Sequence, residues 1–504
     1  MRTKKFLLVA FFVMVMLAMA AYTEDNPRKI SLPGTSVSQQ ATQGIPAPCP
    51  KFLEKLPKAG EQYYPKQPIT KYLKKIIDDN HYVPAFESAI NRVSNQNIPE
   101  LDMIATLDQF YFYLDELVKW KPELRIWVWK NNILHERTDY LRITQFYYYF
   151  NQPELEALQN PIEPNKEEKL TPISSWLRDF AVAWGAFLDT PESKGCIESY
   201  RYAPEYALQD YVHPDPKDYK TFNEYFSREF RDINVQRPIA QPENDRVIVF
   251  PAESTFVGQW TITTEIKEPY KALPSIVVKH VEWPIKELLK DSVYAKDFEG
   301  GILCHSFLNV YDYHRLHTPV KGKVLEAKII PAQVYLEVTL EELTNEQEEE
   351  VNPNLARAVI PQRYLDAKDS TGYQFVQCRG LLVLDSPIGK VAVLPIGMAQ
   401  VSSVVFVNPQ KNNEPIVLTP EEEKQDKTYL AQVELLNKKI KAALVDKTII
   451  LEKGAMFSYF QFGGSDCVMV FERQANVDVT AKADTHYPIR SQYAISNIKK
   501  LLSK

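Results

Sequence analysis

The sequence is poor in glycine and cysteine, and its few, scattered cysteines exclude two classes of protein. Its 504 residues include 16 glycines and 35 prolines, so its loops are many and stiffened by proline. The five cysteines are scattered, with no C-x-x-C pair and no zinc-ligand spacing, which excludes a disulfide-dense scaffold and a zinc module. The net charge of −6, without a long basic block, gives no support for nucleic-acid binding.

A long apolar run occurs only at the N-terminus. Met1–Lys5 is positive, Phe6–Ala20 is apolar, and small residues follow at the spacing of a cleavage site, which predicts a signal peptide over residues 1–21. The protein is therefore expected to be exported to a periplasm, the medium or the lumen of the secretory pathway. Without cleavage the segment would be a membrane anchor, but its apolar run is shorter than the roughly 20 residues that span a bilayer. The mature chain is expected to be soluble or peripheral at a membrane.

The remaining composition is that of a globular protein. The chain is 45% hydrophobic and 25% charged, and its length allows two or more cores. An exported protein could form one or two disulfides, and the odd cysteine count leaves at least one free thiol. The five cysteines are Cys49, Cys196, Cys304, Cys378 and Cys467.

The N-terminal part of the chain is predicted to be helical. After a flexible lead-in over residues 22–50, a helical domain is expected over 51–200, because apolar side chains recur at three- and four-residue spacing in Leu101–Trp120 and Ser174–Leu188. The aromatic stripes of this part are interpreted as core packing. Residues 201–220, dense in proline, tyrosine and aspartate, are predicted to be a linker.

The pattern changes to β-like runs in a second domain, expected over residues 221–504. A short amphipathic helix at Thr221–Phe230 precedes them, Glu341–Asn354 is predicted to be an acidic surface loop, and Glu421–Leu444 to be one charged helix. The fold class is therefore α+β, an all-helical domain followed by a β-rich one. The β-like runs are 246–250, 256–264, 301–304, 322–330, 334–340, 375–384, 391–394 and 401–407.

Gly463-Gly464-Ser465 lies between two strand-like runs and has two interpretations. Gly-Gly and Gly-Ser are ordinary turn dipeptides, so the segment could be a hairpin loop. Alternatively, the Ser465 hydroxyl attacks the carbonyl of Gly464, since glycine allows the distorted backbone that this attack requires.

Two of the eight histidines, His314 and His317, lie three residues apart. A metal site is disfavoured because no third ligand is near and Pro319 and Gly322 end the element at once. The pair could be hydrogen-bonded loop residues or an acid/base pair acting near neutral pH. Glu253 follows a predicted strand, where an exposed turn carboxylate is the default.

Together these motifs resemble the phosphatidylserine decarboxylase family of pyruvoyl-dependent enzymes, over roughly residues 220 to 475. The helical stretch before it, which runs through Trp184–Ser193, looks like the extra N-terminal domain of a branch that includes decarboxylases of free aromatic amino acids. The motifs are, in order, Phe222-x-x-x-Phe226-x-Arg228, Arg237-Pro238, Pro251-Ala-Glu253, Tyr313-His314-Arg315-x-His317-x-Pro319-x-x-Gly322, Gly397 with Val401, and Lys453-Gly454 to Phe462-Gly463-Gly464-Ser465.

The resemblance implies self-cleavage before Ser465. The products would be a β chain ending at Gly464 and an α chain of residues 465–504, whose first residue becomes a pyruvoyl cofactor. That group forms a Schiff base with the substrate amine, so that CO2 can leave. By position, His317 with the acid Glu253 would activate Ser465, and His314 would face the substrate. No metal is implied.

Two features depart from the family pattern, and three functions remain open. Glu253-Ser254 replaces an Asp-Gly turn, and Asp466 places a negative charge next to the nucleophile. The first function is decarboxylation of phosphatidylserine, and the second is decarboxylation of a free aromatic L-amino acid. The third is a non-catalytic exported relative that acts as a binding protein. A serine hydrolase is disfavoured because the Gly-x-Ser-x-Gly elbow is missing.

Overall fold

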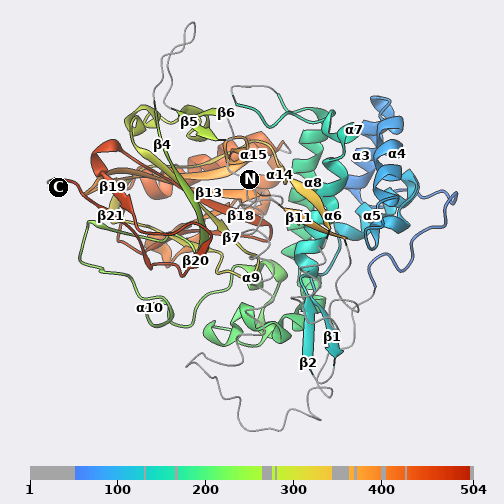
Figure 1. Cartoon of the computed structure of the whole chain (residues 1–504), viewed down its shortest axis with the longest axis horizontal. Coiled ribbons are helices and arrows are strands. Elements are labelled where there is room, and N and C mark those ends of the chain that lie inside the picture. Colours follow the sequence, from blue (N-terminus) through green and yellow to red (C-terminus); the bar gives the residue numbers. More distant parts are fainter. Residues whose placement is uncertain are drawn as a thin grey trace, which may run out of the picture.

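The computed structural model describes residues 51–129, 132–164, 169–263, 275–278, 281–342, 363–367, 372–398, 404–425 and 428–499. The predicted signal peptide and lead-in, Val401 and most of the predicted acidic loop lie outside these ranges. Helices of the first part gather on one side and the strands of the large sheet on the other, while β1, β2 and β11 lie beside the helices (Figure 1). The α+β class is confirmed. One detail differs, because a two-stranded hairpin interrupts the helical part.

α5 and α8 begin at side-chain caps. Thr106 and Gln109 form a reciprocal capping box at the start of α5, and the Thr171 side chain accepts a hydrogen bond from Ser174 N at the start of α8. The α-helices are α3 Pro68–Asp79, α4 Val83–Ser94, α5 Leu107–Leu117, α6 Thr138–Phe150, α7 Pro153–Glu156, α8 Pro172–Leu188, α9 Phe222–Phe226, α10 Ile233–Gln236, α11 Ile285–Leu288, α14 Pro420–Gln425 and α15 Tyr429–Ile440.

The strands follow the predicted β-like runs. They are β1 Arg125–Trp129, β2 Asn132–Glu136, β3 Val247–Val249, β4 Ser254–Thr261, β5 Ser275–Val278, β6 Val281–Pro284, β7 Ile302–Leu308, β8 Arg315–His317, β9 Gly322–Ile330, β10 Val338–Glu342, β11 Arg363–Ala367, β12 Arg379–Ser386, β13 Gly389–Met398, β14 Val404–Asn408, β15 Glu414–Pro415, β16 Ile450–Leu451, β17 Met456–Phe460, β18 Gly464–Phe471, β19 Val477–Val479, β20 Thr485–Tyr487 and β21 Gln492–Ser496.

An eight-stranded antiparallel sheet forms the centre of the β-rich part. Its strand order is β16-β9-β12-β13-β18-β7-β4-β20, which places β18 well inside the sheet. Leu381 to Leu384 of β12 are buried on both faces, because one hydrophobic cluster packs on each side of the sheet. Ser465, the second residue of β18, therefore lies in the interior of the molecule.

A second sheet, of order β15-β14-β17-β8, carries the histidines and the strand that leads to Ser465. Met456 of β17 pairs with His317 of β8, and Tyr459 pairs with Arg315. β17 and β18 belong to different sheets, so Gly463-Gly464-Ser465 is not the loop of a hairpin, and that interpretation is wrong. The segment instead carries the chain from one sheet to the other.

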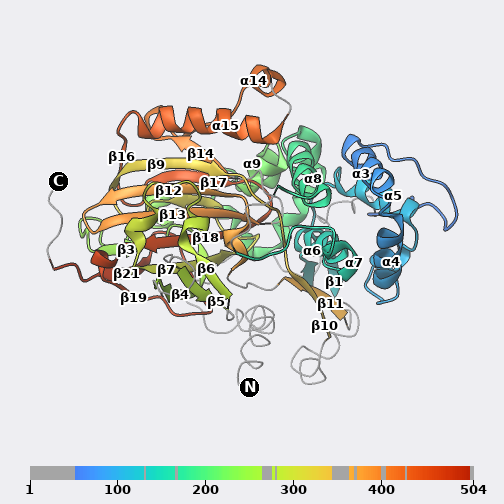
Figure 2. The same ribbon diagram turned by 90° about the horizontal axis from the view of Figure 1, so that it is seen from above.

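The charged segment after residue 420 is two helices and not the single helix that was predicted. α14 ends at Gln425, and Thr428, the N-cap of α15, has an extended backbone with φ of −90° and ψ of 133°. α15 lies along the sheet next to β9 (Figure 2). The Asn437 side chain both accepts from Ile329 N at 2.7 Å and donates to Ile329 O at 2.8 Å, which satisfies backbone groups of β9.

The predicted linker over residues 201–220 is packed against the rest of the protein. It consists of short 3-10 turns, and Tyr206, Tyr211 and Tyr219 are each about 98% or more buried. Side chains from both parts of the sequence contact one another here. The boundaries of the two domains remain predictions. Among the described residues, no helix combines the length and the hydropathy needed to cross a membrane.

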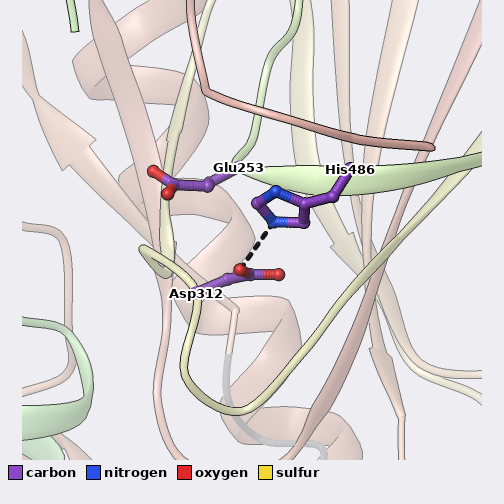
Figure 3. Close-up of side chains that lie close together, drawn as sticks. All are labelled: Glu253, Asp312 and His486. Atoms are coloured by element: carbon purple, nitrogen blue, oxygen red, sulfur yellow. Dashed lines mark hydrogen bonds and ion pairs between the residues drawn. The ribbon is translucent and has the colours of Figure 1, made fainter. Parts of the chain in front are cut away.

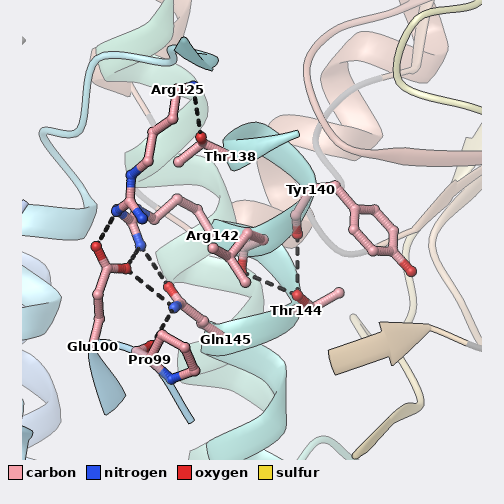
Figure 4. A network of polar contacts seen from close by, with 9 residues as sticks. Pro99, Glu100, Arg125, Thr138, Tyr140, Arg142, Thr144 and Gln145 are labelled. Atoms are coloured by element: carbon pink, nitrogen blue, oxygen red, sulfur yellow. Dashed lines mark hydrogen bonds and ion pairs between the residues drawn. The ribbon is translucent and has the colours of Figure 1, made fainter. Parts of the chain in front are cut away.

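A buried ion-pair network ties the helical part together (Figure 4). Glu100 forms ion pairs with Arg125 and Arg142, and Arg142 also donates to Gln145 at 2.7 Å. Arg142 is fully buried. Burial alone would raise the pKa of Glu100, but the two arginines lower it below its ordinary value.

Replacing Glu100 with alanine should destabilise the helical part strongly. The change leaves the Arg142 guanidinium buried without its counter-ion, which costs about 3–5 kcal/mol of unfolding free energy. Denaturant unfolding followed by tryptophan fluorescence measures this. The matched control is Asp78→Ala, whose exposed pair with Lys74 should contribute about 1 kcal/mol or less. Equal losses in the two variants would contradict the prediction.

Candidate active site

Ser465 lies against His314 in the interior. Its Oγ is 3.2 Å from His314 Nδ1, and both side chains are fully buried. Two chain crossings bring them together. Phe460 N donates to His314 O at 2.8 Å, and Ser465 pairs with Leu308 at the end of β7, from which the histidine loop begins. The loop 309–314 and the segment 461–463 therefore cross between the two sheets side by side.

The environment of His314 fixes its protonation. Its Nε2 lies 3.4 Å from the carbonyl oxygen of Val310, which can only accept, so Nε2 carries the proton and Nδ1 accepts from the Ser465 hydroxyl. Burial, with the nearby charge of Arg228, lowers the pKa of His314 to about 3. The imidazole is therefore neutral at physiological pH, with an unprotonated Nδ1 facing the Ser465 hydroxyl.

His317 does not contact Ser465, which differs from the expected arrangement. Its Nδ1 donates to Gly454 O at 2.7 Å, and its Nε2 is buried with no hydrogen-bond partner within the described part of the chain. Burial, then the charge of Arg490, lowers the pKa of His317 to about 3. The backbone pairing of β8 with β17 accounts for this position, because it places His317 beside the start of β17 and His314 beside its end.

Glu253 does not contact His317 either. Its two carboxylate oxygens accept from Arg237 Nε at 2.9 Å and Nη2 at 2.8 Å, a bidentate pair that holds the carboxylate away from the histidine. The acid–histidine–serine arrangement expected from the resemblance is therefore not assembled in this structure. The Gly454 carbonyl occupies the place at His317 Nδ1 where an acid was expected.

Glu253 lies instead in a charged cluster with Asp312 and His486 (Figure 3). His486 Nε2 is 2.8 Å from Asp312 Oδ1, and Asn309 N donates to Asp312 Oδ2 at 2.7 Å. One donor atom from each of the three residues lies within 4.8 Å of the others, as in a metal site. The carboxylates are already engaged by donors, so we interpret the cluster as a network of ion pairs.

Asp466 faces away from the nucleophile. Successive side chains of a strand point to opposite faces, so Ser465 and Asp466 lie on opposite sides of the sheet. Asp466 Oδ2 accepts from Tyr373 Oη at 3.1 Å and from Gln374 Nε2 at 2.9 Å, and His305 Nε2 is 3.1 Å away. The negative charge that the sequence places next to Ser465 is thus held on the far face of the sheet.

Aromatic rings enclose the Ser465–His314 pair. The ring of Phe226 stacks on His314 with centroids 3.9 Å apart, and Phe460 lies edge-on to the same imidazole. Phe462, which is 2% exposed, packs against Phe226. These rings lower the local polarity and strengthen electrostatic interactions within the site.

Sequence reasoning missed Asp312, His486 and Asn223. Asp312 lies in the same block as His314 but was not singled out, and His486 is distant in sequence from every motif. Asn223 lies within the Phe222–Arg228 motif, and its Oδ1 accepts from Phe462 N at 3.1 Å. The scarcity of histidine was the one signal that could have drawn attention to His486. The partner of each residue follows only from the folded structure.

The His486–Asp312 pair should stabilise the protein below about pH 9 and not above it. Burial alone would lower the pKa of His486, but Asp312, with a smaller contribution from Glu253, raises it to about 9. A raised pKa adds stability that is complete below the unfolded value of about 6.5 and is lost as the pH rises through 9. The melting temperature of wild type should therefore exceed that of His486→Asn most at pH 6, with the difference disappearing by pH 10. A difference independent of pH would contradict this.

Comparison with known proteins identifies the family. A family model described as phosphatidylserine decarboxylase matches residues 222–490, more than half of the chain. The chain belongs to the phosphatidylserine decarboxylase family. The match includes His314, His317 and Ser465 and excludes most of the helical part. This family is one of carboxy-lyases, so the resemblance drawn from the motifs is confirmed.

Individual members of the phosphatidylserine decarboxylase family match at moderate identity. The chain is 27% identical over 297 residues to a phosphatidylserine decarboxylase proenzyme of Fusobacterium nucleatum, covering 59% of this chain and 74% of that protein. It is 28% identical over 255 residues to phosphatidylserine decarboxylase proenzyme 3 of Schizosaccharomyces pombe, covering 50% of this chain but 19% of that longer protein. An L-tryptophan decarboxylase of Psilocybe cyanescens is 26% identical over 117 residues, 23% of this chain and 25% of that protein.

Proposed function

We propose that the protein is a pyruvoyl-dependent decarboxylase that cleaves itself between Gly464 and Ser465. The observation that carries the proposal is the buried contact of Ser465 Oγ with the neutral His314 Nδ1 at 3.2 Å. The names of two relatives call them proenzymes, which fits a chain that must be processed. Ser465 is itself the precursor of the cofactor, so the group fits a position that the serine side chain already fills.

Cleavage would proceed in three steps on the chain itself. Ser465 Oγ gives its proton to an imidazole and attacks the Gly464 carbonyl carbon, and the peptide C–N bond breaks as the Ser465 nitrogen takes up a proton, leaving an ester. Loss of the Ser465 α-proton then breaks the Cβ–O bond and releases the Gly464 carboxylate. Water finally replaces the nitrogen, which leaves as ammonia, and residue 465 becomes a pyruvoyl group.

The pyruvoyl group supplies the electron sink that an amino acid needs in order to lose CO2. The residues around it prepare the reaction. His314 holds a neutral nitrogen against position 465, where it can accept or return a proton. Phe226 fixes the plane of that imidazole by stacking on it, and the surrounding rings exclude water.

Phosphatidylserine is the proposed substrate, and a free aromatic L-amino acid is the alternative. The family model and two of the relatives carry the name of the first, and one relative is an L-tryptophan decarboxylase. Release of carboxyl-labelled CO2 from phosphatidylserine vesicles, and from tryptophan, tyrosine and phenylalanine, tests both with Ser465→Ala as the blank. We expect release from phosphatidylserine. Release from an amino acid alone would favour the alternative, and release from none would favour the non-catalytic binding protein.

We further propose that the protein is exported, as a soluble chain or in peripheral contact with a membrane. The charge and apolarity pattern of residues 1–21 supports export. Cys196 is disulfide-bonded, which suits an oxidising compartment. Cys304, Cys378 and Cys467 are free and buried. Edman sequencing of the secreted β chain should place its N-terminus close to residue 22, whereas a chain that starts at Met1 would contradict signal-peptide cleavage.

A further inference from the structure

The helical part reaches the segment that directly precedes Ser465. Phe462, two residues before Gly464, packs edge-on against Trp184 of α8 with ring centroids 6.1 Å apart, and against Phe222 at 5.3 Å. Trp184 is fully buried and Phe462 is 2% exposed. Trp184, a residue of the helical part, therefore packs directly against the Phe462 side chain next to the cleavage site.

A chain of hydrogen bonds makes a second connection to α8. Asp189, the C-cap of α8, accepts from Asn223 Nδ2 at 3.0 Å, and the Asn223 Oδ1 accepts from Phe462 N at 3.1 Å. Both partners of Asn223 Nδ2, Asp189 and the Gly185 carbonyl, are acceptors, which fixes the orientation of the amide. Asp189 also accepts from Gln461 Nε2 at 3.2 Å on each carboxylate oxygen.

The stability of α8 does not account for Asp189. A carboxylate at the C-terminal end of a helix faces the negative end of the helix dipole, which is unfavourable. Asp189 instead accepts hydrogen bonds from the side chains of Gln461 and Asn223, and Asn223 in turn accepts from Phe462 N. Gln461 and Phe462 are the two residues before Gly463. The carboxylate is therefore better explained by its contacts with the cleavage segment.

Gly463 and Gly464 have no side chains that the protein could hold, so the bond that breaks is oriented by the pairing of Gly464 with Met398 of β13 and by the residues on either side. Downstream, Asp466 is held on the far face of the sheet by Tyr373 and Gln374. Upstream, Gln461 and Phe462 are held by α8 and by Asn223 of α9. The residues on both sides of Gly463 and Gly464 are thus held by contacts, and the upstream contacts depend on the helical part.

We propose that Asp189 and Trp184 of α8 are positioning residues for self-cleavage, so that the helical part completes the cleavage site. This inference rests on the proposed function. Asp189 sets the backbone of Phe462 through Asn223, and Trp184 sets its ring. Together they direct the Gly464 carbonyl toward Ser465 Oγ. A displacement of about 1 Å at such a site can slow a reaction about 100-fold.

The test compares cleavage rates of full-length variants made by in vitro translation and sampled over time on denaturing gels. Asp189→Ala and Trp184→Ala should each slow the appearance of the fragment that begins at residue 465 by about 10- to 100-fold. Asp189→Asn and Trp184→Phe keep an acceptor oxygen and a ring, and should restore a rate within about threefold of wild type. Melting temperatures are measured on the same variants.

Matched controls on the same helix separate positioning from stability. Trp176 is fully buried in α8 but packs on Phe146, Phe150 and Phe180 of the helical core, so Trp176→Ala should lower stability without slowing cleavage. Asp179, which pairs with Arg178, is the control for Asp189.

The cleavage rates of these variants decide whether Trp184 and Asp189 position the cleavage segment. Slow cleavage in the Trp184 and Asp189 variants, with wild-type cleavage in both controls, supports positioning. If Trp176→Ala slows cleavage as much as Trp184→Ala, or if Asp189→Ala cleaves at the wild-type rate, the inference is overturned while the proposed function stands. A wild-type chain that never cleaves overturns both.

Discussion

Ser465→Ala yields a single uncut chain and no release of CO2. The hydroxyl that contacts His314 is the group of residue 465 that can attack the Gly464 carbonyl, and in the proposed function the same residue becomes the cofactor. Removing it stops cleavage and decarboxylation together. Denaturing electrophoresis measures the first effect and the labelled-CO2 assay the second. Ser465→Cys should still cleave, more slowly, since a thiol can also undergo the acyl shift.

The control for this variant is Ser458→Ala. Ser458 is a fully buried serine on β17, seven residues before Ser465, and its Oγ has no hydrogen-bond partner among the described residues. Its replacement should leave both fragments and activity in place. Persistence of two fragments in Ser465→Ala would show that the cut is ordinary proteolysis, and the account of Ser465 would fail.

His314→Ala loses CO2 release at least about 100-fold per cleaved chain, the usual contribution of a positioned acid or base. The imidazole Nδ1 contacts Oγ of Ser465, the residue that would form the cofactor, and Phe226 stacks on the imidazole ring. The assay is normalised to the amount of the fragment that begins at residue 465. Activity per cleaved chain within threefold of wild type would contradict a role for His314 in decarboxylation.

Denaturing electrophoresis of His314→Ala and His317→Ala decides which imidazole takes the Ser465 proton during cleavage. The contact in the structure assigns that proton to His314, whereas the family resemblance assigns it to His317. Only the variant that lacks the acting base should accumulate as an uncut chain. His81→Ala, an exposed surface histidine, is the control for loss of an imidazole without loss of the site.

The fold could be predicted from local patterns where those patterns are strong. The helical period of Ser174–Leu188 predicted α8, and the β-branched runs predicted β9 and β12, because burial of one stripe or of both faces leaves a clear trace in the sequence. The single helix predicted over Glu421–Leu444 was wrong. The extended backbone at Thr428 interrupts a run of charged residues that would all suit a helix.

The contacts of the candidate site could not be predicted in the same way. The motifs identified Ser465, His314, His317 and Glu253, but their partners depend on strand register between segments about 140 residues apart. The pairing of β8 with β17 put His314, and not His317, against the serine. The position of Arg237 drew Glu253 into an ion pair that its own sequence context does not indicate.

The structure also changes how the departures from the family pattern are weighed. Asp466 was expected to oppose an anionic nucleophile, but the alternation along β18 turns it to the other face, where hydrogen-bond donors hold it. Glu253 lies in the cluster with Asp312 and His486, and His317 Nδ1 donates to the Gly454 carbonyl instead of to an acid. The position of Asp466 on the far face therefore weakens the case for a non-catalytic relative.

The intact mass of the purified wild-type protein tests the central claim most directly. Two chains are predicted, a large one ending at Gly464 and a small one of residues 465–504 whose first residue has lost its amine, resists Edman degradation and reacts with phenylhydrazine. A single chain with Ser465 intact, or a small fragment that begins with an ordinary serine amine, would contradict the account.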